Sequence, residues 1–351
     1  MRHNSMATRN GPSSGPRPRS LRRTALLCGA GAAAAVMLLG ACTSGSGEGR
    51  PDVLTRDPVV PAVADEPTEP PTGTVAEFSD PVQALEIDPD SGALLIQSPG
   101  LLTVRSDTSV AAEWELPADA GPVALGDGYA VVPAPDEVLR IDLTSGEIER
   151  AELGGDGLAA AVLGDGRVLV GTEQGALVVF DADLTEQDRI TGFYSVNGLV
   201  VADETVAVLD APQTSLTEFD LAAGERGATV RLGVGATEII GDGYGGVIAA
   251  DTEGDQVIGL GLDPLVVRQM APVGRSPLAP AYDSVRGLYW LALTGEDTVV
   301  GVSIATGEPV VEHTVAAVHD PRAIAVGPDG ELFIGSADGA GLQTVPAEEI
   351  R

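Results

Sequence analysis

A short turn rich in aspartate and glycine recurs along most of this chain, and it limits the possible fold more than any other feature of the sequence. It centres on seven aspartates, which are Asp90, Asp127, Asp165, Asp203, Asp242, Asp283 and Asp329. Their residue numbers differ successively by 37, 38, 38, 39, 41 and 46. Aspartate and glycine are typical of tight hairpins because they tolerate a positive φ. From residue 74 onward, the sequence therefore predicts seven copies of one hairpin-based unit.

Each unit contains four short β-rich runs, and no helical periodicity persists between them. A period near 40 residues with four strands is typical of one propeller blade. The first run of most units carries small residues where strands would converge on an axis: Ala84, Ala124, Ala159, Ala202, Ala281 and Ala325. The predicted fold is all-β, a seven-bladed β-propeller of four-stranded antiparallel blades over residues 74–351.

The two ends of this region complement each other. The seventh unit has runs at residues 323–326, 332–335 and 342–345, and the chain then stops at Arg351, one strand short. An unmatched run, residues 74–79, lies at the other end and is followed by Asp80-Pro81, as the end of unit six is followed by Asp320-Pro321. The N-terminal strand is therefore predicted to close the last blade, which removes an exposed sheet edge.

The repeat with the clearest motif is PRAIAVGPDGELFI at residues 321–334, and it resembles the repeat of YVTN-type and NHL-type bacterial propellers. Residues 273–277, VGRSP, are similar to the segment that opens such repeats. The resemblance implies a propeller architecture, and these families share no single activity. The Gly-His and Trp-Asp signature of WD repeats is absent.

The first 42 residues are typical of an export signal. Arg17, Arg19, Arg22 and Arg23 precede an apolar run over residues 25–40, which is short for a membrane span. The run ends in Leu39-Gly40-Ala41-Cys42, which resembles the lipobox of bacterial lipoproteins. That resemblance implies a signal peptide over residues 1–41, acylation of Cys42, and anchoring at the extracytoplasmic face of the cell membrane. We favour the general secretory route; Arg22-Arg23 leaves the twin-arginine route open.

Residues 42–73 are predicted to form a disordered tether behind the lipidated cysteine. The segment is rich in Pro, Gly, Ser and Thr and offers little apolar surface to bury. Only Cys28 and Cys42 occur in the chain, so the propeller contains no disulfide.

The charge balance bears on possible partners. The chain has 52 acidic residues and 20 basic ones, all of them arginine, and a net charge of −32. Without residues 1–41, 14 arginines remain against the 52 carboxylates. Such a surface repels phosphate backbones, so nucleic acid is excluded as a partner. Solubility explains the acidity most simply, and a preference for cationic ligands is the sharper alternative.

Functional residues are expected where the connections between blades meet at one mouth of the channel. His319, Asp320 and Arg322 are the catalytic candidates, because a base, a carboxylate and a guanidinium could polarise a carbonyl. The candidate ligand-binding residues at this mouth are Tyr194, Asn197, Glu238, Arg275, His319 and Arg322. The simpler interpretation of the His319 cluster is a solvated loop.

No metal site or cofactor is predicted. Calcium remains an alternative at residues 88–90 and 251–255, although neither has the spacing of a calcium loop and turn-forming aspartates explain both. The leading hypothesis is a binding or scaffolding propeller without catalytic activity, whose partner is an envelope protein, a wall component or a small molecule. The rival is an extracytoplasmic lactonase- or lyase-like enzyme, in one version calcium-dependent. A passive spacer in the cell wall is the third hypothesis.

Overall fold

The computed structural model describes residues 54–65, 69–106 and 109–350. The chain divides into two compact units, residues 1–47 and 48–351, and only the second contains described residues. The expected signal peptide, Cys42 and the start of the tether lie outside the described residues. The described part is all-β, as predicted, with strands β1–β26 and two short 3-10 helices, η1 (Ala211–Gln213) and η2 (Ala347–Glu349).

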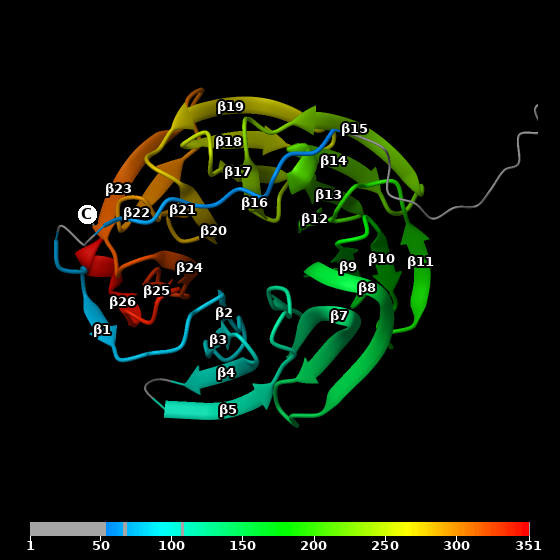
Figure 1. Cartoon of the computed structure of the whole chain (residues 1–351), viewed down its shortest axis with the longest axis horizontal. Coiled ribbons are helices and arrows are strands. Elements are labelled where there is room, and N and C mark those ends of the chain that lie inside the picture. The colour runs from blue at the N-terminus through cyan, green and yellow to red at the C-terminus, as the bar shows by residue number, and fades with distance from the viewer. Residues whose placement is uncertain (1–53, 66–68, 107–108, 351) are drawn as a thin grey trace, which may run out of the picture. The chain divides into compact units, whose positions relative to one another are not determined.

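Five four-stranded antiparallel sheets surround a central opening together with one larger sheet (Figure 1). The first contains β2 (Ala84–Ile87), β3 (Leu94–Ser98), β4 (Leu101–Ser106) and β5 (Ser109–Glu115). The next contains β12 (Gly198–Ala202), β13 (Thr205–Asp210), β14 (Ser215–Asp220) and β15 (Glu225–Arg231). A third contains β16 (Ala236–Gly241), β17 (Gly246–Asp251), β18 (Gln256–Gly261) and β19 (Val266–Pro272). A fourth contains β20 (Pro277–Asp283), β21 (Leu288–Leu293), β22 (Thr298–Ser303) and β23 (Val310–Ala316).

The fifth four-stranded sheet joins the two ends of the propeller sequence. It contains β24 (Pro321–Val326), β25 (Leu332–Ser336), β26 (Leu342–Val345) and β1 (Thr74–Ala76). In β1, Thr74 pairs with Thr344 and Ala76 with Leu342, both antiparallel. The predicted closure of the last sheet by the N-terminal strand is therefore confirmed.

The predicted number of separate blades is wrong, because the strands form six sheets rather than seven. The sixth sheet has six strands: β6 (Ala124–Leu125), β7 (Tyr129–Asp142), β8 (Ile148–Val162), β9 (Val168–Thr172), β10 (Leu177–Phe180) and β11 (Glu186–Ile190). It carries the second and third sequence units together.

The fusion of these two units follows from two unusually long strands. The first part of β8 pairs with β7, and its second part, from Gly157 onward, pairs with β9. Gly154, Gly155 and Gly157 lie where one unit passes into the next, and glycine allows the strand to bend there without leaving the sheet.

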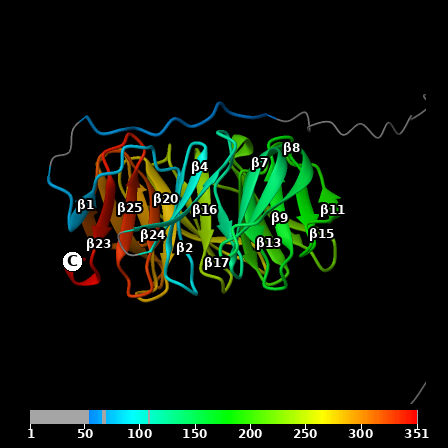
Figure 2. The same cartoon turned by 90° about the horizontal axis from the view of Figure 1, so that it is seen from below.

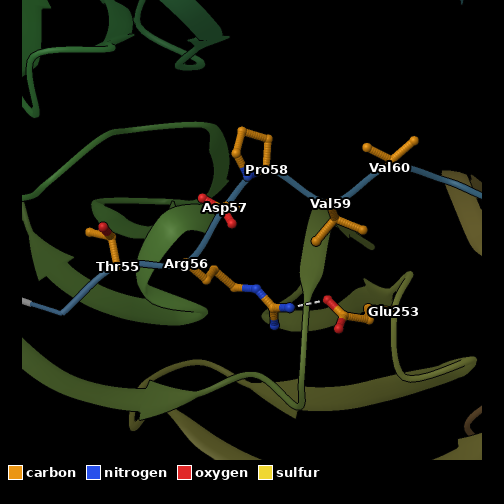
Figure 3. A pocket seen from close by; sticks show the side chains of 7 residues that line it. All are labelled: Thr55, Arg56, Asp57, Pro58, Val59, Val60 and Glu253. Atoms are coloured by element: carbon orange, nitrogen blue, oxygen red, sulfur yellow. Dashed lines mark hydrogen bonds and ion pairs between the residues drawn. The ribbon is translucent and has the colours of Figure 1, made fainter.

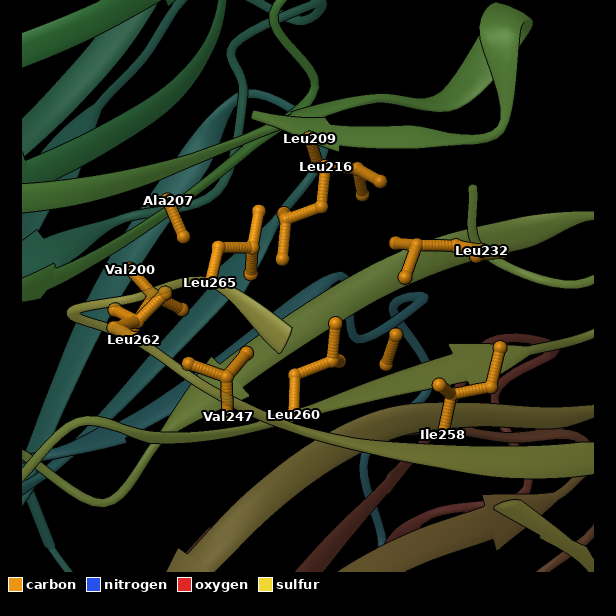
Figure 4. Close-up of a cluster of buried hydrophobic side chains, with 12 residues drawn as sticks. Val200, Ala207, Leu209, Leu216, Leu232, Val247, Ile258, Leu260, Leu262 and Leu265 are labelled. Atoms are coloured by element: carbon orange, nitrogen blue, oxygen red, sulfur yellow. The ribbon is translucent and has the colours of Figure 1, made fainter. Parts of the chain in front are cut away.

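The core consists of apolar layers between neighbouring sheets. One such layer joins Leu209 of β13 and Leu216 of β14 to Val247 of β17 and Ile258 of β18, all with 0% exposure (Figure 4). Valine, leucine, isoleucine and alanine supply most of each layer, which suits thin sheets packed face to face. Each fully buried aliphatic side chain contributes about 1.5–3 kcal/mol to this packing.

Residues 54–65, here called the strap, lie along one face of the ring (Figures 1 and 2). They have no regular secondary structure, but the Arg56 N–H donates to Pro212 O at 3.0 Å and the Ala64 N–H to Thr294 O at 2.9 Å. Further on, the Thr72 N–H donates to Ala316 O at 3.0 Å. This part of the expected free coil is therefore hydrogen-bonded to the propeller. We call the side that carries it the strap face.

Candidate channel-mouth site

The predicted site residues all lie on the strap face or just below it. Tyr194 and Asn197 lie between β11 and β12, Arg275 between β19 and β20, and His319 and Asp320 between β23 and β24. Glu238 and Arg322 lie near the starts of the inner strands β16 and β24. They therefore lie at one end of the ring, as expected for residues in and beside the connections between sheets, although they do not form one cluster.

His319 is held between two carboxylates from neighbouring connections. Its Nδ1 lies 2.8 Å from Asp297 Oδ2, and its Nε2 lies 3.6 Å from Asp338 Oδ2. The Asp297 side chain is nearly buried, and its other oxygen accepts the Asp320 N–H at 3.0 Å. The hydrogen bond with Asp297 raises the pKa of His319, although desolvation opposes the shift. His319 therefore gains proton affinity and links two sheets, which suits a structural clamp better than a neutral general base.

Arg322 and Glu238 are electrostatically linked at the inner strands. Arg322 Nε donates to Asp320 Oδ1 at 2.7 Å. Glu238 Oε2 accepts the Ala279 N–H from β20 at 2.7 Å. Burial raises the pKa of Glu238 to about 7, while the Ala279 N–H and the charge of Arg322 act in the opposite direction. Desolvation outweighs both, so this carboxyl is partly protonated at neutral pH.

Glu86 of the inner strand β2 is a second deeply placed carboxyl, and sequence analysis missed it. Burial alone raises its pKa to about 7. The residue keeps partial exposure. Little in the sequence marks this residue, because Glu86 occupies an ordinary alternating position in a short strand.

The remaining candidates take part in hydrogen bonds between strands and connections. The Tyr194 N–H donates to Asp210 Oδ2 at 2.7 Å, and Asn197 Oδ1 accepts the Ala211 N–H at 3.0 Å. The exposed Arg275 donates its backbone N–H to Glu296 Oε1 at 2.7 Å. These contacts hold the connections in place and do not assemble a reactive group.

The strap packs against sheet β16–β19 on the strap face (Figure 3). The Arg56 guanidinium forms an ion pair with Glu253 in the turn between β17 and β18. Strap residues 55–60 and Glu253 line a cavity of about 540 Å³. A Cβ atom at Gly235 would come within 2.9 Å of Val59 Cγ2, so the absence of a side chain there permits the close approach. The Ala62 N–H also donates to Ser276 Oγ at 2.9 Å.

The two calcium alternatives fall on aspartates that serve turns. Asp88 accepts the Ser91 hydroxyl, and Asp251 accepts the N–H groups of Val234 and Gly235. Across residues 54–65, 69–106 and 109–350, no three or more His, Cys, Asp or Glu side chains are grouped so that they could hold a metal ion. Within the same part of the chain, no helix has the length and apolar character needed to cross a membrane.

Comparison with known proteins identifies the fold class and no family. No family model matches this sequence, and no curated protein matches it. A chain in the crystal structure of a mitotic checkpoint complex superposes with a TM-score of 0.68 at 14% identity, covering 83% of this chain and 98% of that one. A chain of Kuenenia stuttgartiensis hydrazine synthase gives 0.66 at 12% identity, with 79% and 98% covered. At these identities the likeness shows the fold alone, and the protein is a β-propeller.

Proposed function

We propose that this chain is an extracytoplasmic propeller lipoprotein that is anchored to the membrane through Cys42 and works as a binding platform without catalytic activity. The observation that carries the platform role is the clamping of His319 between Asp297 and Asp338. The most reactive candidates at the mouth are engaged in holding sheets together, while the ring supplies a rigid and largely exposed surface.

The anchoring part of the proposal rests on the sequence. The apolar run before Leu39-Gly40-Ala41-Cys42 fits a lipoprotein signal. Leu54, the first described residue, follows Cys42 by 12 positions, and a chain of that length spans at most about 40 Å. A lipid on Cys42 would therefore hold the propeller close to the membrane surface.

The platform part is supported by the versatility of the fold. One structural neighbour is a chain of a multi-protein checkpoint complex, which fits a propeller that presents surfaces to other proteins. This support is an analogy between folds, because one fold hosts many functions. An envelope protein is the partner class we propose for this chain.

Two substitutions test the anchor. Cys42→Ser should move the protein from the membrane fraction to the soluble extracytoplasmic fraction, because the acylated thiol is lost. Cys28→Ser is the matched control, since Cys28 lies inside the predicted signal peptide, and it should leave the protein on the membrane. Membrane retention of the Cys42→Ser protein would overturn the anchoring proposal.

The platform role is tested by site-specific photocrosslinking in intact membranes. A crosslinker at the exposed Arg275 of the strap face should give one saturable adduct with an envelope protein, and a crosslinker at Asp329, in a turn at the other end of the strands, should not. Equal labelling from both positions, or none from Arg275, would contradict the proposal.

One observation favours the enzyme as a second candidate. Glu86 and Glu238 both have pKa values raised to about 7 by burial, and such carboxyls suit proton transfer at neutral pH. The enzyme hypothesis predicts turnover of a lactone or related ester that Glu238→Gln or His319→Ala abolishes. Such turnover would replace the platform proposal.

A further inference from the structure

A cavity of about 360 Å³ lies between sheets β16–β19 and β20–β23, at the end of the ring opposite the strap. Its walls include the turns β16–β17 and β20–β21, whereas the strap contacts the turns β17–β18 and β21–β22 at the other ends of the same strands. We call it the tyrosine pocket. Six residues define its chemistry: Asp242, Tyr244, Leu262, Gln269, Tyr282 and Tyr289.

Three of the five tyrosines in the chain line this one pocket. The rings of Tyr282 and Tyr289 lie 5.0 Å apart at an interplanar angle of 47°. Tyr289 is 2% exposed and forms the inner wall, while Tyr244 is 92% exposed at the rim. Aromatic residues make up only 3% of the sequence, so this concentration of rings sets the pocket apart from the aliphatic layers of the core.

Among the described residues, one buried polar atom of the pocket has no hydrogen-bond partner, Gln269 Oε1. The buried hydroxyl of Tyr289 interacts with the Asp242 carboxylate. Gln269 Nε2 donates to Ile304 O at 2.8 Å, which leaves its oxygen as the free end of the amide. A buried oxygen that is left unpaired is unfavourable, so a ligand that donates to Gln269 Oε1 is favoured. Gln269 Oε1 can only accept, so the ligand must donate hydrogen bonds.

Asp242 adds a negative charge beside these atoms. Its Oδ1 accepts the N–H groups of Tyr244 at 2.7 Å and Gly246 at 2.9 Å. A Cβ atom at Gly246 would lie 2.2 Å from Asp242 Oδ2 and 3.2 Å from Tyr289 Oη. The missing side chain thus keeps Oδ2 and the hydroxyl next to each other.

We propose that the tyrosine pocket binds a small organic monocation, a primary ammonium ion with an apolar or aromatic body. Its N–H groups would donate to Asp242, Tyr289 and Gln269, and its body would pack against Tyr282 and Leu262. Carboxylates and aromatic faces attract such cations, and the net charge of −32 raises their local concentration. This site does not depend on the lipid anchor or on the strap face.

Arg268 limits the ligand to a single positive charge. It is exposed, it lines the same pocket, and its guanidinium lies across Gly261 at the rim. A second ammonium group on the ligand would face this cation, so diamines should bind more weakly than monoamines.

The test uses the full chain, purified in a non-ionic detergent, with benzylammonium as the probe. Isothermal titration calorimetry at moderate ionic strength should show saturable binding of benzylammonium. Benzyl alcohol, which has the same body without the charge, should bind at least about tenfold more weakly, equivalent to about 1.4 kcal/mol. Benzoate should not bind. Equal binding of benzylammonium and benzyl alcohol, or no saturable binding of benzylammonium, would overturn the proposal.

Variants separate the pocket from general attraction of cations by the acidic surface. Asp242→Asn keeps an oxygen that accepts from Tyr244 and Gly246 and removes only the charge, so it should weaken benzylammonium binding about tenfold or more with little change in melting temperature. Asp329→Asn is the matched control, because Asp329 occupies the equivalent turn of the last sheet, away from the pocket. Tyr282→Leu, a second variant, should weaken binding by removing one ring. If Asp242→Asn and Asp329→Asn change the affinity equally, the binding is not in this pocket.

Discussion

The two ends of the ring use the same repeated unit in opposite ways. At the strap face, buried acidic and amide groups mostly bind neighbouring backbone: Asp251 accepts from Val234 and Gly235, and Gln343 Oε1 accepts from Val318 at 2.9 Å. At the opposite end, Gln269 Oε1 is buried and has no partner within the described part of the chain. Hydrogen bonds made within the fold stabilise the ring, while unpaired groups are available to a ligand.

The two ends differ in what their connections join. At the strap face, connections run from one sheet to the next, and buried carboxylates such as Asp251 and Asp297 accept their backbone N–H groups. At the pocket, the turns join strands of one sheet, and Asp242 accepts the N–H groups of its own turn. Four groups on the strap face are exceptions, because they are buried without a partner among the described residues: Arg56 Nε and the hydroxyls of Ser98, Thr214 and Thr298.

The largest expected effect comes from breaking the strap-face network at Asp251. Asp251 is 0% exposed and also accepts from Gln256 Nε2 at 2.6 Å. Asp251→Ala leaves three donors without their acceptor and should lower the free energy of unfolding by about 3 kcal/mol or more. Denaturant melts would measure it. The control Asp329→Ala, in an exposed turn, should stay within about 0.5 kcal/mol of wild type, and a loss as large as that of Asp251→Ala would refute the contrast.

Glu86 should show a gain of stability on substitution. Its folded pKa of about 7 lies above the ordinary glutamate value of 4.5, so ionising it opposes folding as the pH rises from about 4.5 to above 7. Glu86→Gln should therefore stabilise the protein by up to about 3 kcal/mol at pH 8 and leave it unchanged at pH 4. Thermal melts at the two pH values are the measurement, and an equal effect at both would show that ionisation is not the cause.

His319 should show the opposite pH dependence. Its pKa is raised in the folded state by Asp297, so its stabilising effect is complete below the unfolded value near 6.5 and is lost as the pH rises through the folded value. His319→Gln should cost about 1 kcal/mol at pH 5.5 and less at alkaline pH. A cost that stays constant from pH 5.5 to 9.5 would indicate lost packing rather than a charged clamp.

The smallest expected effect is at the strap ion pair. The Arg56 and Glu253 side chains are 27% and 46% exposed, so Arg56→Ala should change global stability by less than about 1 kcal/mol. Hydrogen exchange of the Ala62 and Ala64 amides should nevertheless become faster if the pair helps to hold the strap. Unchanged exchange would assign the docking to the backbone hydrogen bonds alone.

The fold was largely predictable because its signals are local. Turn aspartates and glycines gave the unit and its period, and the missing last strand matched the surplus first one. The fusion of two units was not predictable from that period, because it depends on whether β7 and β8 bend within one sheet or break. The strap was missed for a similar reason: a Pro-rich segment has no core of its own, and its docking depends on Gly235 and the turns beneath it.

The positions of the candidate residues in the fold were predictable, and their contacts were less so. His319 and Arg322 lie on the expected face, but the His319 partners Asp297 and Asp338 belong to other turns, which the sequence alone does not bring together. The tyrosine pocket did leave a signal: Tyr244 and Tyr282 adjoin the repeated turn aspartates Asp242 and Asp283. Neighbouring copies of one turn lie side by side in a ring. Tyrosines beside two neighbouring copies of the turn therefore predict a shared aromatic pocket.

The pairing of β1 with β26 also affects how the protein is made. Thr74 and its partner Thr344 are 270 positions apart, so the first strand emerges from the ribosome long before its partner exists. Closing so long a loop is slow compared with forming local hairpins. A chain that terminates before β26 lacks the partner strand and leaves its last sheet unfinished. Only a chain that has been synthesised through β26 can therefore close the ring.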